Sequence, residues 1–129
     1  MERGIRMEKE AIIRRYFQSW IDRDIDVLEQ VFSDDVTYTE CYGPEYHGLT
    51  QLLKWFADWN ERGTVLKWEI KGFIQQGSLT AVEWTFACDY DHEIGEFDGV
   101  SLIEFDEDMK MVRVKEFQSK AEHVYPYGE

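Results

Sequence analysis

The chain has 129 residues and carries 27 acidic against 14 basic side chains, a formal net charge of −13 at pH 7. Its length is that of one ordinary domain, and apolar and aromatic contents of 43% and 16% are high enough to build a core. The excess of acids argues against a nucleic-acid-binding protein, which contacts phosphates through clustered Lys and Arg, and against docking on an anionic membrane. We therefore expect one folded domain that binds neither nucleic acid nor membranes.

The sequence also bears on the cellular compartment. No uninterrupted apolar run approaches the roughly 18 to 20 residues that cross a bilayer, and the start, MERGIRMEKE, lacks the apolar stretch of a secretory signal. Only Cys41 and Cys88 are present, without a CxxC spacing. These features predict a cytoplasmic protein with two reduced thiols.

Helical spacing predicts three helices. From residue 8 to 21 apolar side chains recur at three- and four-residue steps: Ile12, Ile13, Tyr16, Phe17, Trp20 and Ile21. A second, short helix is expected after Asp24, which can cap it, and should run through Phe32, with residues 33–35 closing it. The third is expected over residues 49–62, where Gly63 is placed to end it.

A two-residue period predicts the strands. The first covers residues 36–42, with Val36, Tyr38, Glu40 and Tyr42 on one face, and runs into a loop at residues 43–48. Four longer strands are expected at about 66–74, 82–90, 97–105 and 111–119. Because the helices are segregated from a mostly antiparallel sheet, the fold class is α+β. Three helices cannot cover both faces of a long curved sheet, so we expect a pocket on one face and a second subunit of a homodimer on the other.

The segments RRYFQSW, VLEQVFSDDVTYTECYGPEYHG, LLKWF, GEFDGVSLIEF and KMVRVKEF resemble one superfamily of cone-shaped domains. It contains nuclear transport factor 2, SnoaL-like polyketide cyclases and ketosteroid isomerases. The resemblance covers residues 8–119 and implies a single SnoaL-like domain over residues 1–129, with an internal pocket. It does not settle the function, because this fold hosts enzymes, ligand carriers and binding modules.

The comparison with ketosteroid isomerases implies roles for four residues. Tyr16 falls where that family has a tyrosine oxyanion donor, and Glu40 begins an acid-x-x-Gly sequence like that of the family's base. Ser101 stands where the family has a protonated Asp, which argues against steroid isomerase activity because a hydroxyl is a weaker donor. Glu116 adds an acid at a pocket position. Limonene epoxide hydrolases use an Arg between two carboxylates, and we find no Arg on the inward face of the long strands.

The alternation of side chains independently points Glu40 and Glu116 inward. Burial would raise the pKa of each carboxyl, and two acids in one pocket could share a proton, so that one acts as base and the other as donor. The alternatives are a solvated strand end for Glu40, and a salt bridge or a register slip of one residue for Glu116. Tyr16 lies on the buried stripe of the first helix, where a phenol can donate to an enolate oxygen or simply bond to the backbone.

The remaining candidate substrate-binding residues would form the walls and mouth of the pocket: Trp20, Trp55, Trp59, Trp84, Phe86, Cys88, Ser101 and His47. The aromatic side chains could instead be plain core, and Trp68 could lie in the pocket wall or at a dimer face. Residues 89–93 contain carboxylates and an imidazole but match no metal-binding motif, so we expect a solvated hairpin tip and no metal.

Taken together, the residues and the resemblance predict a cofactor-independent enzyme for proton transfer on a neutral, apolar carbonyl compound. Isomerase, cyclase and dehydratase chemistry all fit, with Glu40 as base, Tyr16 as oxyanion donor and Glu116 as auxiliary acid. The alternative is a non-catalytic ligand-binding or dimerising module. Residues 72–109 contain ten acids and no Lys or Arg, an acidic exterior that would repel an anionic substrate.

Overall fold

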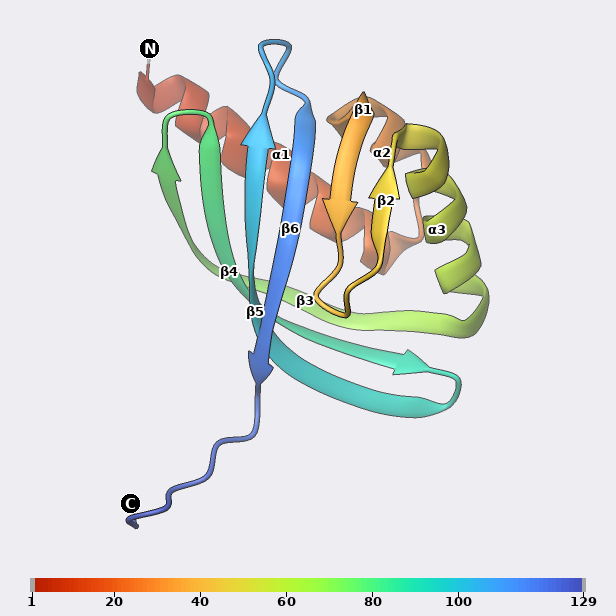
Figure 1. Ribbon diagram of the computed structural model, residues 1–129, viewed down its shortest axis with the longest axis vertical. Helices are drawn as coiled ribbons and strands as arrows, with labels where there is room; N and C mark the ends of the chain where they lie inside the picture. Colours follow the sequence, from red (N-terminus) through yellow and green to blue (C-terminus); the bar gives the residue numbers. More distant parts are fainter. Residues whose placement is uncertain (1, 129) are drawn as a thin grey trace.

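The computed structural model describes residues 2–128, in which three helices lie against one face of a curved sheet (Figure 1). The elements are α1 (Glu2–Asp22), α2 (Asp26–Val31), β1 (Phe32–Thr39), β2 (Glu45–His47), α3 (Leu49–Arg62), β3 (Gly63–Gln76), β4 (Leu79–Tyr90), β5 (Glu93–Phe105) and β6 (Met111–Lys120). The predicted α+β class and curved sheet are confirmed. In the part of the chain that is described, no helix is both long and apolar enough to cross a membrane.

The six strands form one sheet in the order β2-β1-β6-β5-β4-β3. All neighbours are antiparallel except β1 and β6, which run parallel. The long strands β3, β4 and β5 bend around the helices (Figure 1), and α1 packs against β3. The concave face of the sheet therefore carries both the core and the space beneath α3.

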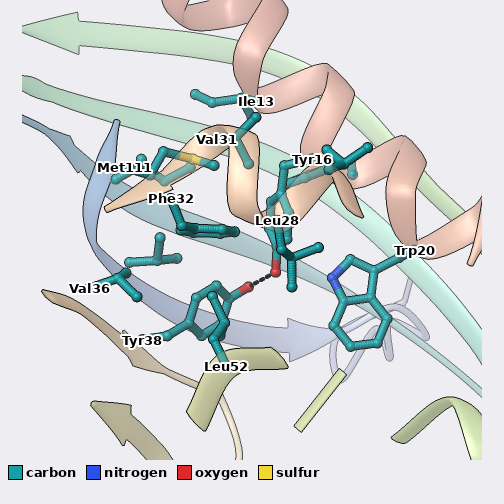
Figure 2. Packing of buried hydrophobic residues seen from close by; sticks show 14 of the residues in the cluster. Ile13, Tyr16, Trp20, Leu28, Val31, Phe32, Val36, Tyr38, Leu52 and Met111 are labelled. Carbon is teal, nitrogen blue, oxygen red and sulfur yellow. Dashed lines mark hydrogen bonds between the residues drawn. The ribbon is translucent and has the colours of Figure 1, made fainter. Parts of the chain in front are cut away.

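The core centres on the inward face of α1. Tyr16 and Phe17 are almost fully buried, and the ring of Phe17 stacks on Trp68 with centroids 3.7 Å apart. Figure 2 shows Phe32, Leu28 and other apolar side chains packed around the hydroxyl groups of Tyr16 and Tyr38. Trp68 thus belongs to the concave face of the sheet, which settles the alternative left open for it.

Two irregularities in β3 change the expected alternation. Its pairing with β4 shifts between Val65 and Lys67 and again between Ile70 and Gly72. A bulge inserts one extra residue, so the inward side chains no longer follow a strict two-residue period. Val65 and Trp68 are buried while Leu66 is half exposed. An unbroken two-residue period over the predicted strand 66–74 would place Leu66 and Trp68 on one face, and the bulge is the reason that they do not share one.

Several predicted boundaries are also wrong. The first helix begins at Glu2, and Phe32 opens β1 instead of ending α2, because the backbone becomes extended there (φ −105°, ψ 146°). The segment Glu45–His47, expected in a loop, is a strand paired with β1. β5 begins at Glu93, because its exposed first residues pair with the end of β4. The strand segments Glu45–His47 and the start of β5 form through backbone pairing, which leaves no apolar period in the sequence.

The β4–β5 connection is a tight hairpin, as predicted for this acidic segment. Asp91 and His92 have φ values of 51° and 70°. Two consecutive residues in the left-handed region are typical of a type I′ turn, whose twist matches that of the flanking strands. Both side chains are exposed.

Gly99 in β5 is a sterically required glycine, and it generates a stability prediction. A Cβ there would lie 2.6 Å from the carbonyl oxygen of Phe117 and still closer to the ring of Trp84. We expect Gly99→Ala to lower the free energy of unfolding by about 2–3 kcal/mol, because overpacking a core forces strained shifts. Gly95→Ala is the matched control in the same strand, since a Cβ at Gly95 meets nothing within 4 Å. Equal denaturation midpoints for the two variants in urea would contradict the packing described.

Candidate active site

A cavity of about 900 Å³ opens between α3, the β1–β2 connection and the concave face of the sheet. Most of its wall is aromatic. Side chains from the helices and β2 form one side: Trp20, Tyr46, Trp55 and Trp59. The sheet supplies the other: Trp68, Trp84, Phe86, Tyr90 and Phe97. This wall suits a ligand with substantial apolar surface.

Two carboxyl groups, Glu40 and Glu116, also line the cavity. The parallel pairing of β1 with β6 aligns Tyr38 with Val114 and Thr39 with Lys115. The next residue along each segment is Glu40 and Glu116, so the register brings the two acids together on the inward side. Neither carboxyl forms a salt bridge within the described residues.

Burial raises the pKa of both carboxyl groups to about 7. For Glu40, hydrogen bonding from the side chains of Tyr46 and Trp55 opposes the rise in pKa without cancelling it. For Glu116, hydrogen bonding from Tyr38 also opposes the rise, while the nearby charge of Glu40 adds to it. Both groups therefore exchange protons near neutral pH, as a general acid–base pair requires.

Two tyrosine hydroxyl groups form hydrogen bonds in series that end at Glu116. The Tyr16 hydroxyl donates to the Tyr38 oxygen over 2.7 Å, and the Tyr38 hydroxyl donates to Oε2 of Glu116 over 2.5 Å (Figure 2 shows the first of these bonds). Burial is the main reason that the pKa of each phenol lies well above its ordinary value. Both tyrosines therefore act as neutral donors. Tyr38 was not predicted as a site residue, although the predicted strand 36–42 placed it on the same face as Glu40; in the structure β1 ends at Thr39 and Glu40 follows it.

Eight of the predicted site residues lie in the cavity wall: Trp20, Glu40, Trp55, Trp59, Trp84, Phe86, Cys88 and Glu116. Tyr16 is only 1% exposed and lies behind the wall, with its hydroxyl proton directed to Tyr38. Ser101 is fully buried and accepts a hydrogen bond from Nε1 of Trp84 at 2.9 Å. His47 is exposed on β2 and pairs with Glu45 at 2.7 Å. These last three residues therefore do not contact the cavity.

The wall also contains residues that sequence reasoning did not single out as site residues. Tyr46, Cys41 and Tyr42 come from the β1–β2 connection and β2, and Tyr90 and Phe97 come from the sheet. Tyr90 and Phe97 could have been found, since they lie on the same strand faces as Cys88 and Ser101. Tyr42 could also have been found, since it shares the predicted face of Glu40, whereas Cys41 could not, because a short loop does not keep the alternation of a strand.

The two thiols have no nucleophilic character. Burial raises the pKa of Cys41 to about 12, and it also raises the pKa of Cys88. A thiol with a raised pKa is protonated at neutral pH and is a poor nucleophile. Among residues 2–128, no three His, Cys or acidic side chains are grouped so as to hold a metal ion.

Comparison with known proteins places the fold. The family model for the SnoaL-like domain matches residues 13–114, so the chain belongs to the SnoaL-like family. No curated protein matches the chain in sequence.

Solved structures of the same fold are similar to this chain at low sequence identity. A hypothetical protein with a ketosteroid isomerase-like fold from Catenulispora acidiphila, solved in complex with trimethylamine, shares 15% identity, covers 85% of both chains and gives a TM-score of 0.74. An LEH-like epoxide hydrolase from M. tuberculosis shares 14% identity over 88% of this chain and 84% of its own, with a TM-score of 0.78. A protein of unknown function, like nuclear transport factor 2, from Burkholderia xenovorans shares 20% identity over 96% and 93%, with a TM-score of 0.74.

The raised pKa values predict how stability depends on pH. A carboxyl with a pKa of about 7 when folded and 4.5 when unfolded binds its proton more tightly in the folded state. The resulting stabilisation is complete below pH 4.5 and is lost as the pH rises through 7. After allowance for solvent screening, we expect the free energy of unfolding to fall by about 1–2 kcal/mol per carboxyl across this range.

Glu116→Gln isolates the contribution of one carboxyl, because the amide oxygen can still accept from Tyr38. Denaturant unfolding at a series of pH values should give a flatter profile for this variant than for the wild type. Glu107→Gln, at an exposed position in the β5–β6 turn, should keep the wild-type slope. Superimposable slopes for all three proteins would contradict the raised pKa of Glu116.

Proposed function

We propose that the protein is an enzyme that transfers a proton next to a carbonyl group, on an apolar small molecule held in the cavity and without a cofactor. The observation that carries the proposal is the pair Glu40 and Glu116, placed together in an aromatic cavity with pKa values near 7. A general base is most effective when its pKa lies near the working pH.

The two acids take different parts in the proposed reaction. Ionised Glu40 removes the proton from the carbon next to the carbonyl, and the electron pair moves onto the carbonyl oxygen as an enolate. Glu116, holding the proton that the pair shares, donates a hydrogen bond to that oxygen, as a carboxylic acid kept neutral by burial can do. In an isomerisation, Glu40 then returns its proton to a different carbon. In cyclase chemistry the enolate carbon attacks a second carbonyl, whose oxygen takes the proton from Glu40; in dehydratase chemistry the enolate expels a β-hydroxyl group, which leaves as water with that proton.

The tyrosines have a positioning part in this scheme. Tyr38 holds Glu116 through its 2.5 Å hydrogen bond, and Tyr16 holds Tyr38. The role of oxyanion donor, assigned to Tyr16 from the resemblance, passes to Glu116 in the proposal because Tyr16 lies behind the wall.

Membership of the SnoaL-like family and the trimethylamine complex of a protein with the same fold support binding of a small molecule. The cavity volume is within the range of roughly 300–1,000 Å³ common for ligand sites. The alternative function is a non-catalytic ligand-binding module. It is favoured by one observation, that the phenol of Tyr16 does not reach the cavity.

A homodimer is part of the proposal. The outer face of the sheet carries partly exposed Val100 and Leu102 beside Phe117, whose exposed fraction is 46%. Apolar side chains on an uncovered sheet face favour a second subunit there. Analytical ultracentrifugation at low micromolar protein should show a dimer, and a monomer would contradict this assembly.

A cytoplasmic location is also proposed. Cys41 and Cys88 are both free thiols, which is typical of proteins kept in a reducing compartment.

The catalytic proposal is tested by Glu40→Gln. The substrate is first identified by native mass spectrometry of the purified protein and by turnover of candidate carbonyl compounds. We expect kcat to fall by about 10²- to 10⁴-fold, because the amide cannot accept the proton. Ligand affinity should change by only a few-fold, since Gln keeps the size of Glu.

The matched control is Glu45→Gln, the same substitution on the same hairpin but outside the cavity wall, which should keep wild-type turnover. Unchanged turnover in Glu40→Gln would remove the proposed base. A co-purified ligand that no protein variant converts would favour the non-catalytic alternative.

A further inference from the structure

Aromatic rings enclose the cavity from two sides. On the helix side, Tyr46 stacks on Trp55 with centroids 4.8 Å apart, and Trp20 lies 5.0 Å from Trp55 and 5.3 Å from Trp59. On the sheet side, the rings of Trp84, Phe86 and Phe97 contact one another edge to face or tilted. The face of an aromatic ring is electrostatically negative and attracts cations, and indole is the strongest of these rings.

The cavity also has unbalanced negative charge. Its two basic side chains lie at the mouth and are already paired, Lys54 with Asp58 at 3.2 Å and Arg62 with Asp91 at 2.5 Å. Arg62 additionally lies over the ring of Tyr90, 5.5 Å from its centroid. Among the described residues, no cation of the protein faces Glu40 or Glu116. Within the described residues, both carboxyl groups therefore lack a positively charged partner that a cationic ligand would have to displace.

The acidic exterior of the protein also favours a cationic ligand. The ten acids between residues 72 and 109 are all exposed or partly exposed, and the chain carries a net charge of −13. A strongly negative surface raises the local concentration of cations as well as repelling anions.

We infer that the cavity takes a ligand carrying a cationic ammonium group, which is held by the aromatic faces of the wall and by the negative charge of the pair Glu40 and Glu116, including when one proton remains on Glu116. The inference rests on the proposed function for the use of this cavity, and it narrows the substrate to an apolar carbonyl compound that also bears a basic nitrogen. It replaces the neutral substrate expected from the sequence. A neutral ligand would displace water from two carboxyl groups and give them no compensating charge, whereas an ammonium group stabilises their ionised forms.

The ionisation of two groups sets the pH dependence of this binding. Cys41 and Tyr46 have pKa values raised to about 12, and burial also raises the pKa of Tyr42, Cys88 and the two tyrosines behind the wall. These groups stay uncharged near neutral pH. At the mouth, Lys54 is paired with Asp58 and Arg62 with Asp91. Glu40 and Glu116 are therefore the groups whose charge changes through pH 7, and cation binding should strengthen as the pH rises through that value.

The test uses two probes of the same shape and different charge, phenyltrimethylammonium and tert-butylbenzene. The quaternary ammonium keeps its charge at every pH. Dissociation constants are measured with the wild-type protein at low salt by the shifts of indole N–H signals in NMR. At pH 8 we expect the cation to bind at least about tenfold more tightly than the neutral probe, and this ratio should fall several-fold at pH 6, where the aromatic faces supply most of the remaining preference. A neutral probe that binds equally well or better at pH 8, or a ratio that does not change with pH, would overturn the inference.

Two variants test whether the preference for the cationic probe depends on Glu40 and Glu116. Glu40→Gln/Glu116→Gln should lower the ratio of cation to neutral-probe affinity measured at pH 8 several-fold, because only the aromatic faces then favour the cation. Glu104→Gln, an acid in β5 paired with Arg113 outside the cavity, should keep that preference. The wild-type comparison needs no variant, so it decides the inference even if the double variant is unstable.

The result is separable from the catalytic proposal. Loss of turnover in Glu40→Gln without any preference for the cationic probe would leave the proton-transfer function standing and remove the ammonium ligand. A clear preference for the cation with no loss of turnover in Glu40→Gln would do the reverse.

Discussion

The parallel pairing of β1 with β6 is the constraint on which the cavity depends. It aligns Tyr38 with Val114 and Thr39 with Lys115, and so carries Glu40 and Glu116 to the same place on the concave side of the sheet. Two ionised acids in a desolvated space repel each other, so both strands must be held firmly to keep Glu40 and Glu116 close. Here a longer antiparallel framework fixes β6, and the hydrogen bond from Tyr38 fixes the carboxyl of Glu116. Burial raises the pKa of both carboxyl groups, and the charge of Glu40 adds to the rise at Glu116.

This pairing also explains why the tyrosines act as buried hydrogen-bond donors while the two acids face the cavity. Tyr16 and Tyr38 are enclosed by core side chains and act as neutral donors, one to the other and then to Glu116. Glu116 faces both this buried chain and the cavity. The buried hydrogen bonds thus orient one acid, Glu116. Glu40, held at the end of β1 by the β1–β2 connection, remains available to a ligand. The ion pairs of the cavity wall, Lys54 with Asp58 and Arg62 with Asp91, lie at its mouth, where solvent screens their charges.

Much of this arrangement could be predicted from the sequence, for reasons specific to each residue. The apolar stripe of α1 and the alternation around Tyr38 and Val114 gave the inward direction of Glu40 and Glu116, because one buried face leaves a clear period. The closeness of the two acids could not be derived from a period, since they are 76 residues apart in sequence and only the strand register brings them together. The same limit applies to the bulge that exposes Leu66, and to Tyr46, whose three-residue strand is too short to show alternation. Tyr16 shows a different limit: burial was predicted, but burial behind the wall and burial in the wall give the same sequence pattern.

The central claim is that two cavity carboxyl groups share protons near neutral pH because the fold desolvates them together. The most direct measurement is a carbon-13 NMR titration of the glutamate side-chain carboxyls, assigned with Glu40→Gln and Glu116→Gln, in the wild type and in Tyr38→Phe. The account predicts that Glu40 and Glu116 titrate near pH 7 in the wild type, and that Tyr38→Phe moves Glu116 higher because its carboxylate loses a donor. Titration of both groups near 4.5, the value of an ordinary glutamate, would contradict it.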